Sequence, residues 1–183
     1  MRVLAISGSL RTDSYNRKAL QAAKKFAAAT GAEVEEIDLR ELNLPMYDGD
    51  IEARGLPEPV QKLKAALAAT DLLILATPEY NYSISGALKN AIDWTSRGGN
   101  SFDGKVAAIF GASTGPFGTL RAQLQFRLML TALNVHVLPQ PQVFIRFADQ
   151  AFNDDGSLKD QKTADQLKLL VEKTIALAQR IKG

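Results

Sequence analysis

Short apolar runs, each followed by an amphipathic helical segment, recur along the whole chain, and this alternation limits the possible folds most strongly. Residues 3–6, 72–77 and 105–110 are almost continuously apolar, as expected for strands covered on both faces. Parallel strands joined by helical crossovers produce this order of elements. The pattern therefore predicts an α/β three-layer sandwich.

The remaining elements complete that architecture. Helices are predicted from Ser14 to a stop at Gly31, over 57–69, from Ser83 or Ser85 to Gly98, over 119–133 and over 167–178. Residues 34–37 form a weaker strand near a sheet edge, and Pro139 and Pro141 interrupt a fifth strand over 135–145. Five strands favour the flavodoxin-like order 2-1-3-4-5 in a parallel sheet.

Two segments stand out from the regular alternation. Residues 39–56 are predicted to be a structureless loop of about 18 residues, longer than the usual ~12–15 and therefore a candidate for function. Residues 126–133 are apolar nearly all round the helix, which indicates burial on more than one side. A subunit interface is the predicted second cover, and a helix sunk in a single core is the alternative.

Length and composition exclude several classes of protein. A chain of 183 residues with 46% apolar content suits one domain over 1–183. Its net charge of +2 does not predict nucleic acid or an anionic membrane as a partner. The absence of cysteine excludes thiolate chemistry, and one histidine, His136, cannot form a zinc site alone. No signal peptide or membrane span is recognised, so a cytoplasmic protein is expected.

The turns after strands 1, 3 and 4 should converge at the edge of the sheet where doubly wound folds bind ligands. The first turn, SGSLRTDSYN, supplies hydroxyls (Ser7, Ser9, Thr12, Ser14), the Arg11 guanidinium, the Asn16 amide and the free N–H groups of a helix start. A phosphate monoester requires such donors, although a loop with helix-capping serines is the alternative. Asp13 would repel phosphate, so it should face solvent or cap the helix.

The other two turns suit an aromatic ring. In TPEYNYSISG, Pro78 stiffens the backbone, Tyr80 and Tyr82 offer flat surfaces, and Asn81 offers an amide, although the tyrosines could also be ordinary packing residues. Glu79 is expected to bond the backbone of a neighbouring turn or subunit. The small residues of GASTGPFG would let the backbone approach a ligand edge. Without GxGxxG or a P-loop motif, a mononucleotide is favoured.

These three motifs, with the longer segment TPEYNYSISGALKNAIDW, resemble the NADPH-dependent FMN reductase family, in particular its quinone, chromate and azo reductases. The resemblance spans nearly the whole chain and implies bound FMN, hydride transfer from NADPH or NADH, and a homodimer or homotetramer. Helix 83–97 and the apolar fourth helix would form the interface. Some members carry a tyrosine where this chain has Leu124, which puts any tyrosine-based subunit contact in doubt.

The resemblance also assigns residues by position. The phosphate and ribityl chain would be held by Ser9, Leu10, Arg11, Ser14, Tyr15 and Asn16. The isoalloxazine would be held by Pro78, Glu79, Tyr80, Asn81 and Tyr82, and its other edge by Ser113, Thr114 and Gly115. A backbone N–H in the Tyr80 to Tyr82 turn is predicted to bond flavin N5. No catalytic acid or base and no metal are expected, because the flavin performs the chemistry.

Several alternatives stay open at this stage. Arg17 is a candidate for the 2′-phosphate of NADPH, or a solvated helix arginine. A flavodoxin-like electron carrier would share the fold and cofactor but would not turn over NAD(P)H. A cofactor-free regulatory or interaction domain would share the fold alone. Arg11 and the net charge of +2 argue against the carrier, because such carriers are usually strongly acidic.

Overall fold

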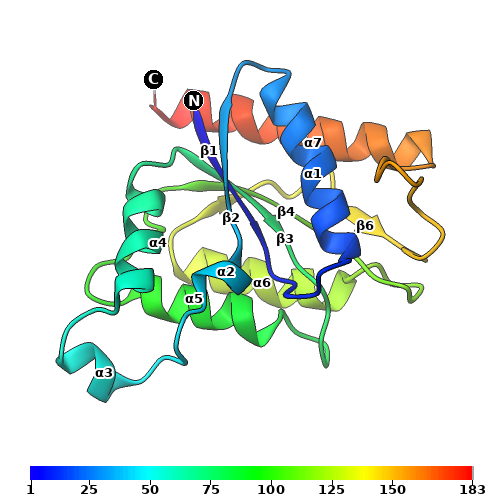
Figure 1. Cartoon of the computed structure of the whole chain (residues 1–183). Coiled ribbons are helices and arrows are strands. Elements are labelled where there is room, and N and C mark those ends of the chain that lie inside the picture. The colour runs from blue at the N-terminus through cyan, green and yellow to red at the C-terminus, as the bar shows by residue number, and fades with distance from the viewer. Residues whose placement is uncertain (183) are drawn as a thin grey trace.

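The computed structural model describes residues 1–182 and shows strands alternating with helices (Figure 1). The elements in chain order are β1 (Arg2–Ser7), α1 (Tyr15–Ala28), β2 (Glu33–Ile37), α2 (Leu39–Leu42), α3 (Gly49–Ala53), α4 (Glu58–Ala68), β3 (Leu72–Ala76), α5 (Gly86–Ser96), β4 (Val106–Ala112), α6 (Leu120–Ala132), β5 (His136–Val137), β6 (Val143–Ile145) and α7 (Gln161–Lys182). The predicted helices and strands are therefore present.

The sheet is parallel throughout, with the order β2-β1-β3-β4-β5, which confirms the predicted flavodoxin-like arrangement. The predicted fifth strand is divided: β5 pairs with the beginning of β4, and β6 pairs with its end. Pro139 and Pro141 lie between β5 and β6. Proline lacks the N–H that a strand ladder needs, which accounts for the break.

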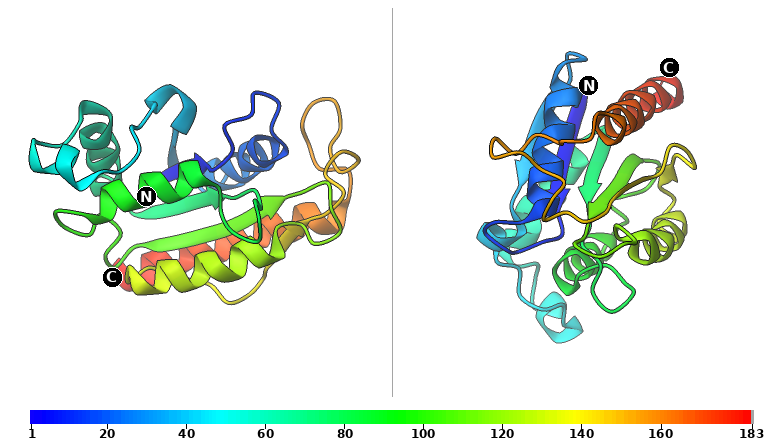
Figure 2. Two further views of the ribbon diagram at one scale, coloured as in Figure 1. Left: turned by 90° about the horizontal axis from the view of Figure 1, so that it is seen from below. Right: turned by 90° about the vertical axis from the view of Figure 1, so that its right-hand side faces the viewer.

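Helices cover both faces of the sheet, as the two further views in Figure 2 show. Alternate residues of β1 point to opposite faces: Val3 and Ala5 pack in the core under α1 and α7, whereas Leu4 and Ile6 pack under α4, α5 and α6. This burial on both sides explains why β1, β3 and β4 are apolar at successive positions.

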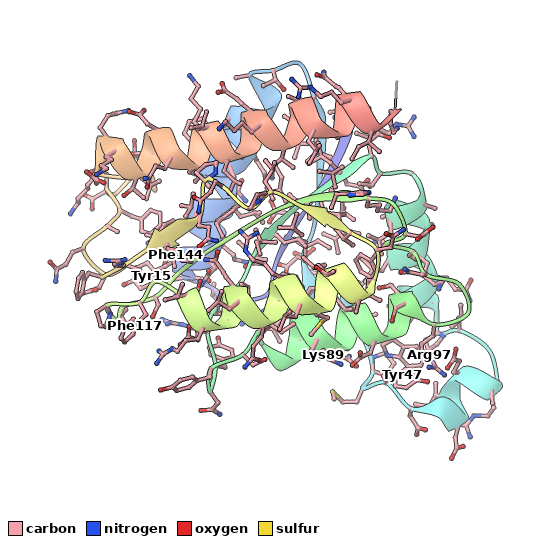
Figure 3. The ribbon with its side chains drawn as sticks, turned by 180° about the vertical axis from the view of Figure 1, so that it is seen from behind. Tyr15, Tyr47, Lys89, Arg97, Phe117 and Phe144 are labelled. Atoms are coloured by element: carbon pink, nitrogen blue, oxygen red, sulfur yellow. The ribbon has the colours of Figure 1, made fainter. Side chains whose placement is uncertain are left out.

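Residues 39–56 do not form the structureless loop predicted from the sequence. They contain α2 and α3, which begin after the N-caps Asp38 and Asp48. The segment is also fastened to α5, because Asn90 Nδ2 and Trp94 Nε1 both donate to the carbonyl oxygen of Pro45, at 2.9 and 2.7 Å. Figure 3 shows Tyr47 and Arg97 together at this corner.

The outer face of α6 is apolar and exposed in the single chain. Phe126 and Leu130 are fully buried beneath the helix, whereas Leu124 is 51% and Leu128 74% exposed. One side of α6 is therefore buried in the core of the chain, and the opposite side is not. A second cover for this face remains a prediction.

Candidate functional site

The turns after β1, β3 and β4 lie beside one another at the carboxyl edge of the sheet, as predicted. The pairing of the strands continues into the turns, because the N–H of Gly8 donates to Ala76 O at 2.8 Å and that of Thr77 donates to Phe110 O at 2.9 Å. Three consecutive neighbours in the sheet thus end at one level. Their loops form a common surface, which is where ligands bind in this type of fold.

In the first turn, two buried serine hydroxyls are fixed by backbone donors. Ser9 Oγ accepts from the N–H of Arg11 at 3.4 Å, and Ser14 Oγ accepts from Asn16 and Arg17 as the N-cap of α1. Each hydroxyl still has its own hydrogen to donate, and neither gives it to any of residues 1–182. Such oriented donors suit the oxygens of a phosphate.

Charge in this turn is distributed as a phosphate requires. Asp13 is 79% exposed and pairs with Lys18 at 3.0 Å, which confirms that it faces solvent. Arg11 is exposed and forms no ion pair within the described chain. The exposed Leu10 has its carbonyl oxygen held by the Arg40 guanidinium. The positive charge of Arg11, just before the start of α1, is therefore not balanced by an ion pair within residues 1–182.

Tyr15 and Asn16 have structural partners that the sequence did not indicate. The Asn16 side chain bridges the backbone of Ala112, donating from Nδ2 to its oxygen and accepting its N–H on Oδ1, both at 2.9 Å. Tyr15 stacks on Phe152 with 6.0 Å between ring centroids. Asn16 thereby connects the first turn to the end of β4, and its amide is engaged by backbone of the chain itself.

The second turn is a tight hairpin. The backbones of Tyr80 and Ser83 exchange two hydrogen bonds, of 2.9 and 3.1 Å, around Asn81 and Tyr82, which have φ of 49° and 68°. A non-glycine residue at positive φ is uncommon, and two in succession indicate a conformation maintained by its surroundings. Asn81 and Tyr82 are exposed residues, and their backbone N–H groups donate to none of residues 1–182.

The side chains of this hairpin separate by role. Pro78 is buried, whereas Tyr80 and Tyr82 are 48% and 61% exposed, so the tyrosines are not core residues. Glu79 turns toward α6 and accepts hydrogen bonds from its backbone, which confirms the expected contact with a neighbouring segment.

In the third turn, the backbone packs closely against the backbone of β6. The N–H of Ser113 donates to Ile145 O at the end of β6, at 3.0 Å, and its carbonyl oxygen accepts the N–H of Ala148 at 3.1 Å. Its Oγ accepts the N–H of Gly115 at 3.1 Å. Thr114 is exposed. Gly118 has φ of 55°, and a Cβ there would lie 2.7 Å from the backbone of Phe144. The turn thus needs glycine where it approaches β6.

A cavity of about 280 Å³ separates the first and second turns, lined by Gly8, Leu10, Arg11, Arg40, Tyr80, Ser85, Gly86 and Ala87. Arg40 is a residue of this site that the sequence did not indicate, because it follows β2 rather than one of the three turns. Arg17, the candidate for binding the 2′-phosphate of NADPH, forms an ion pair with Asp38. Its charge is therefore already balanced by a carboxylate.

Other predicted features lie away from the three turns. His136 is exposed on β5 opposite Val106, at the amino end of β4. Within residues 1–182, three or more His, Cys, Asp or Glu side chains nowhere gather in a way that would hold a metal ion. No helix in the same residues is both long and apolar enough to cross a membrane.

The chain is similar to known flavin-dependent reductases over its whole length. The sequence pattern of the NADPH-dependent FMN reductases matches residues 1–150. An NAD(P)H-dependent FMN reductase of Pseudomonas aeruginosa is 44% identical, with 100% of this chain and 98% of that protein covered. An NAD(P)H:quinone oxidoreductase of Solanum tuberosum is 38% identical, with coverage of 100% and 95%.

A solved structure supports the same relationship. The flavoenzyme NAD(P)H:(acceptor) oxidoreductase FerB of Paracoccus denitrificans superposes with a TM-score of 0.86 at 35% identity. The match covers 98% of this chain and 97% of that one. The similarity therefore includes all three turns as well as the sheet.

Proposed function

The chain belongs to the NADPH-dependent FMN reductase family, and from this membership we propose that it is an FMN-dependent NAD(P)H oxidoreductase that reduces quinones. One structural observation carries the proposal. Buried serine hydroxyls and an Arg11 that forms no ion pair within residues 1–182 lie beside a hairpin with exposed tyrosines, whose Asn81 and Tyr82 N–H groups donate to none of the same residues. Phosphate donors next to a ring platform match the two halves of FMN.

The chain's own residues would bind the cofactor in three parts. The phosphate and ribityl chain would be bound by Ser9, Leu10, Arg11, Ser14, Tyr15 and Asn16. Because the Asn16 amide is already bound to Ala112, its contribution would come through the position it gives to the loop. The isoalloxazine ring would be bound by Pro78, Glu79, Tyr80, Asn81 and Tyr82. Its far edge would be bound by Ser113, Thr114 and Gly115.

When bound, FMN accepts a hydride from NAD(P)H and passes two electrons to an acceptor. The protein's task is then to orient and to shield. Arg11 would neutralise phosphate charge, the Tyr80 and Tyr82 rings would exclude water from the edge of the flavin ring, and a backbone N–H in the Tyr80 to Tyr82 turn would donate to flavin N5. No side chain would need to act as acid or base, and NAD(P)H and the acceptor would occupy the same binding surface in turn.

Three further properties belong to this proposal. The acceptors include free flavins, azo compounds and chromate besides quinones, because an exposed flavin face selects weakly. Residues 1–183 act as one FMN-binding domain located in the cytoplasm, where NAD(P)H is supplied. The enzyme assembles as a homodimer or homotetramer through α5 and the exposed apolar face of α6.

Steady-state kinetics test the proposal. The FMN-loaded protein should oxidise NADPH or NADH in the presence of benzoquinone, and comparing both nucleotides across quinone, azo, chromate and FMN acceptors defines its preferences. Full loading with FMN but no turnover would instead indicate an electron carrier. A protein that neither shows a flavin spectrum nor takes up added FMN would be a cofactor-free domain.

A further inference from the structure

Glu79 belongs to the second turn, but its carboxylate caps α6. Its Oε2 accepts the backbone N–H groups of Arg121 at 3.0 Å and Ala122 at 3.3 Å. The N-cap residue Thr119 provides no side-chain hydrogen bond to these donors. A carboxylate at this position satisfies free N–H groups and interacts favourably with the positive end of the helix dipole. Glu79 thus attaches the ring-binding hairpin to the helix that follows the third turn.

Arg121 makes a second connection between the same two turns. Its guanidinium pairs with Glu79 Oε1 and lies 4.1 Å from the ring centroid of Tyr82 and 4.7 Å from that of Phe117. Tyr82 comes from the second turn and Phe117 from the third, and Figure 3 shows Phe117 beside the start of α6. Cations are attracted to aromatic faces at such distances. Arg121 therefore lies between two largely exposed rings.

The two side chains of this pair are largely shielded from solvent and balance each other's charge. The Glu79 side chain is only 8% exposed, so its charge depends on Arg121 for compensation. The Nε of Arg121 is buried, and no partner for it is found within the described chain. Hydrogen bonding to Glu79 raises the pKa of Arg121 above its ordinary value, so the guanidinium stays charged. Two opposite charges are thereby held at the edge of the proposed flavin-ring site.

We propose that Glu79 and Arg121 are positioning residues that fix the hairpin around Tyr82 against the turn around Phe117, and that their charges together set the potential felt by the ring. This inference rests on the proposed function, because the ring between these turns is that of FMN. Neither residue is required to touch the cofactor or to take part in electron transfer.

Removing the Glu79 charge and removing the Arg121 charge should shift the midpoint potential of bound FMN in opposite directions. Glu79→Gln keeps an oxygen for the α6 donors but leaves the Arg121 cation unbalanced, which favours the more negative reduced cofactor. We expect about a tenfold rise in the affinity for reduced relative to oxidised FMN, equivalent to about +30 mV for a two-electron couple. Arg121→Met leaves the Glu79 carboxylate unbalanced and should shift the potential downward.

In the double variant, the FMN affinity and the midpoint potential should respond differently. Arg121→Met also removes the common contact of Tyr82 and Phe117, so oxidised FMN should bind about tenfold more weakly. Combining it with Glu79→Gln restores electrical balance but not that contact. The double variant should therefore return to a potential near wild type while keeping the weakened affinity.

The experiment measures the FMN dissociation constant by fluorescence quenching and the midpoint potential of the FMN-loaded protein, with urea unfolding of the FMN-free protein for each variant. Glu36→Gln is the matched control, because Glu36 pairs with Lys24 at a partly buried position outside the three turns. The control should leave the FMN dissociation constant within twofold of wild type and the midpoint potential unchanged. If Arg121→Met does not fold, Arg121→Lys keeps the charge but not the flat stacking, and should weaken FMN with little change in potential.

Two results would overturn the inference. Lower unfolding stability in the single variants, with dissociation constant and potential unchanged, would make the pair a structural ion pair only. For Arg121→Lys, wild-type affinity would contradict the role of the stacked contact. If wild-type protein itself binds no FMN, the proposed function fails and takes this inference with it, so the two failures are distinguishable.

Discussion

Replacing Asn16 by alanine should destabilise the protein even without a ligand. The side chain supplies both hydrogen-bond partners of the Ala112 backbone, each at 2.9 Å, and Ala112 is 4% exposed. Alanine would leave a buried N–H and a buried carbonyl unpaired, at about 1–3 kcal/mol for each group. With the groups relaxing in part, we expect a loss of about 3 kcal/mol. For a chain of this length, that corresponds to a fall in Tm of about 6–12 °C.

Urea and thermal unfolding of FMN-free protein measure this effect directly. Asn153→Ala is the matched control, because the Asn153 amide bonds Ser157 at an exposed position and its loss should cost less than about 0.5 kcal/mol. The FMN dissociation constant is measured in parallel. Wild-type stability combined with much weaker FMN binding would refute the argument, since Asn16 would then serve the ligand rather than Ala112.

Three other changes give simpler outcomes. Arg11→Ala removes the unpaired guanidinium, so FMN should bind about 10- to 100-fold more weakly by fluorescence titration. Although burial raises the pKa of Glu36, hydrogen bonds from Lys24 and Gln21 hold it below its ordinary value. Glu36→Gln should therefore cost roughly 0.5–1 kcal/mol in unfolding experiments at pH 7, a difference lost as pH falls below about 4. If the proposed oligomer forms through α6, Leu128→Lys should dissociate it in light scattering, whereas Leu169→Lys on α7 should not.

The sheet was predictable because its information is local. Each central strand is an uninterrupted apolar run, and each crossover helix shows its buried face in the spacing of its residues. The position of Asp13 was predictable for a similar reason, since a carboxylate within a ring of anion-binding donors must turn away or neutralise them. Sequence-local signals for α2 and α3 were also present in Asp38 and Asp48, but the length of the segment obscured them.

The partners in the contacts made by the turns were not predictable, because they lie far apart in the chain; for Glu79, only a bond to some neighbouring backbone was expected. Asn16 and Ala112 are 96 positions apart, and Glu79 and Arg121 are 42 apart. The sequence predicts that Asn16 belongs to the ligand loop but contains nothing that pairs its amide with a particular backbone group. The same holds for Arg40, whose bond to Leu10 depends on how α2 packs beside the first turn.

These long-range contacts have a common consequence for ligand binding. Asn16 connects the first turn to the third, and Glu79 connects the second turn to α6, the helix that follows the third turn. Ser85 completes the set, because its hydroxyl donates to Gly8 O and accepts the N–H of Leu88 in α5. Side chains that bind backbone thus connect the first turn to both others, and connect the second turn to the helix that follows the third. The entropy of ordering the three turns is then lost on folding rather than on binding, which favours a pre-formed site and tight retention of the cofactor.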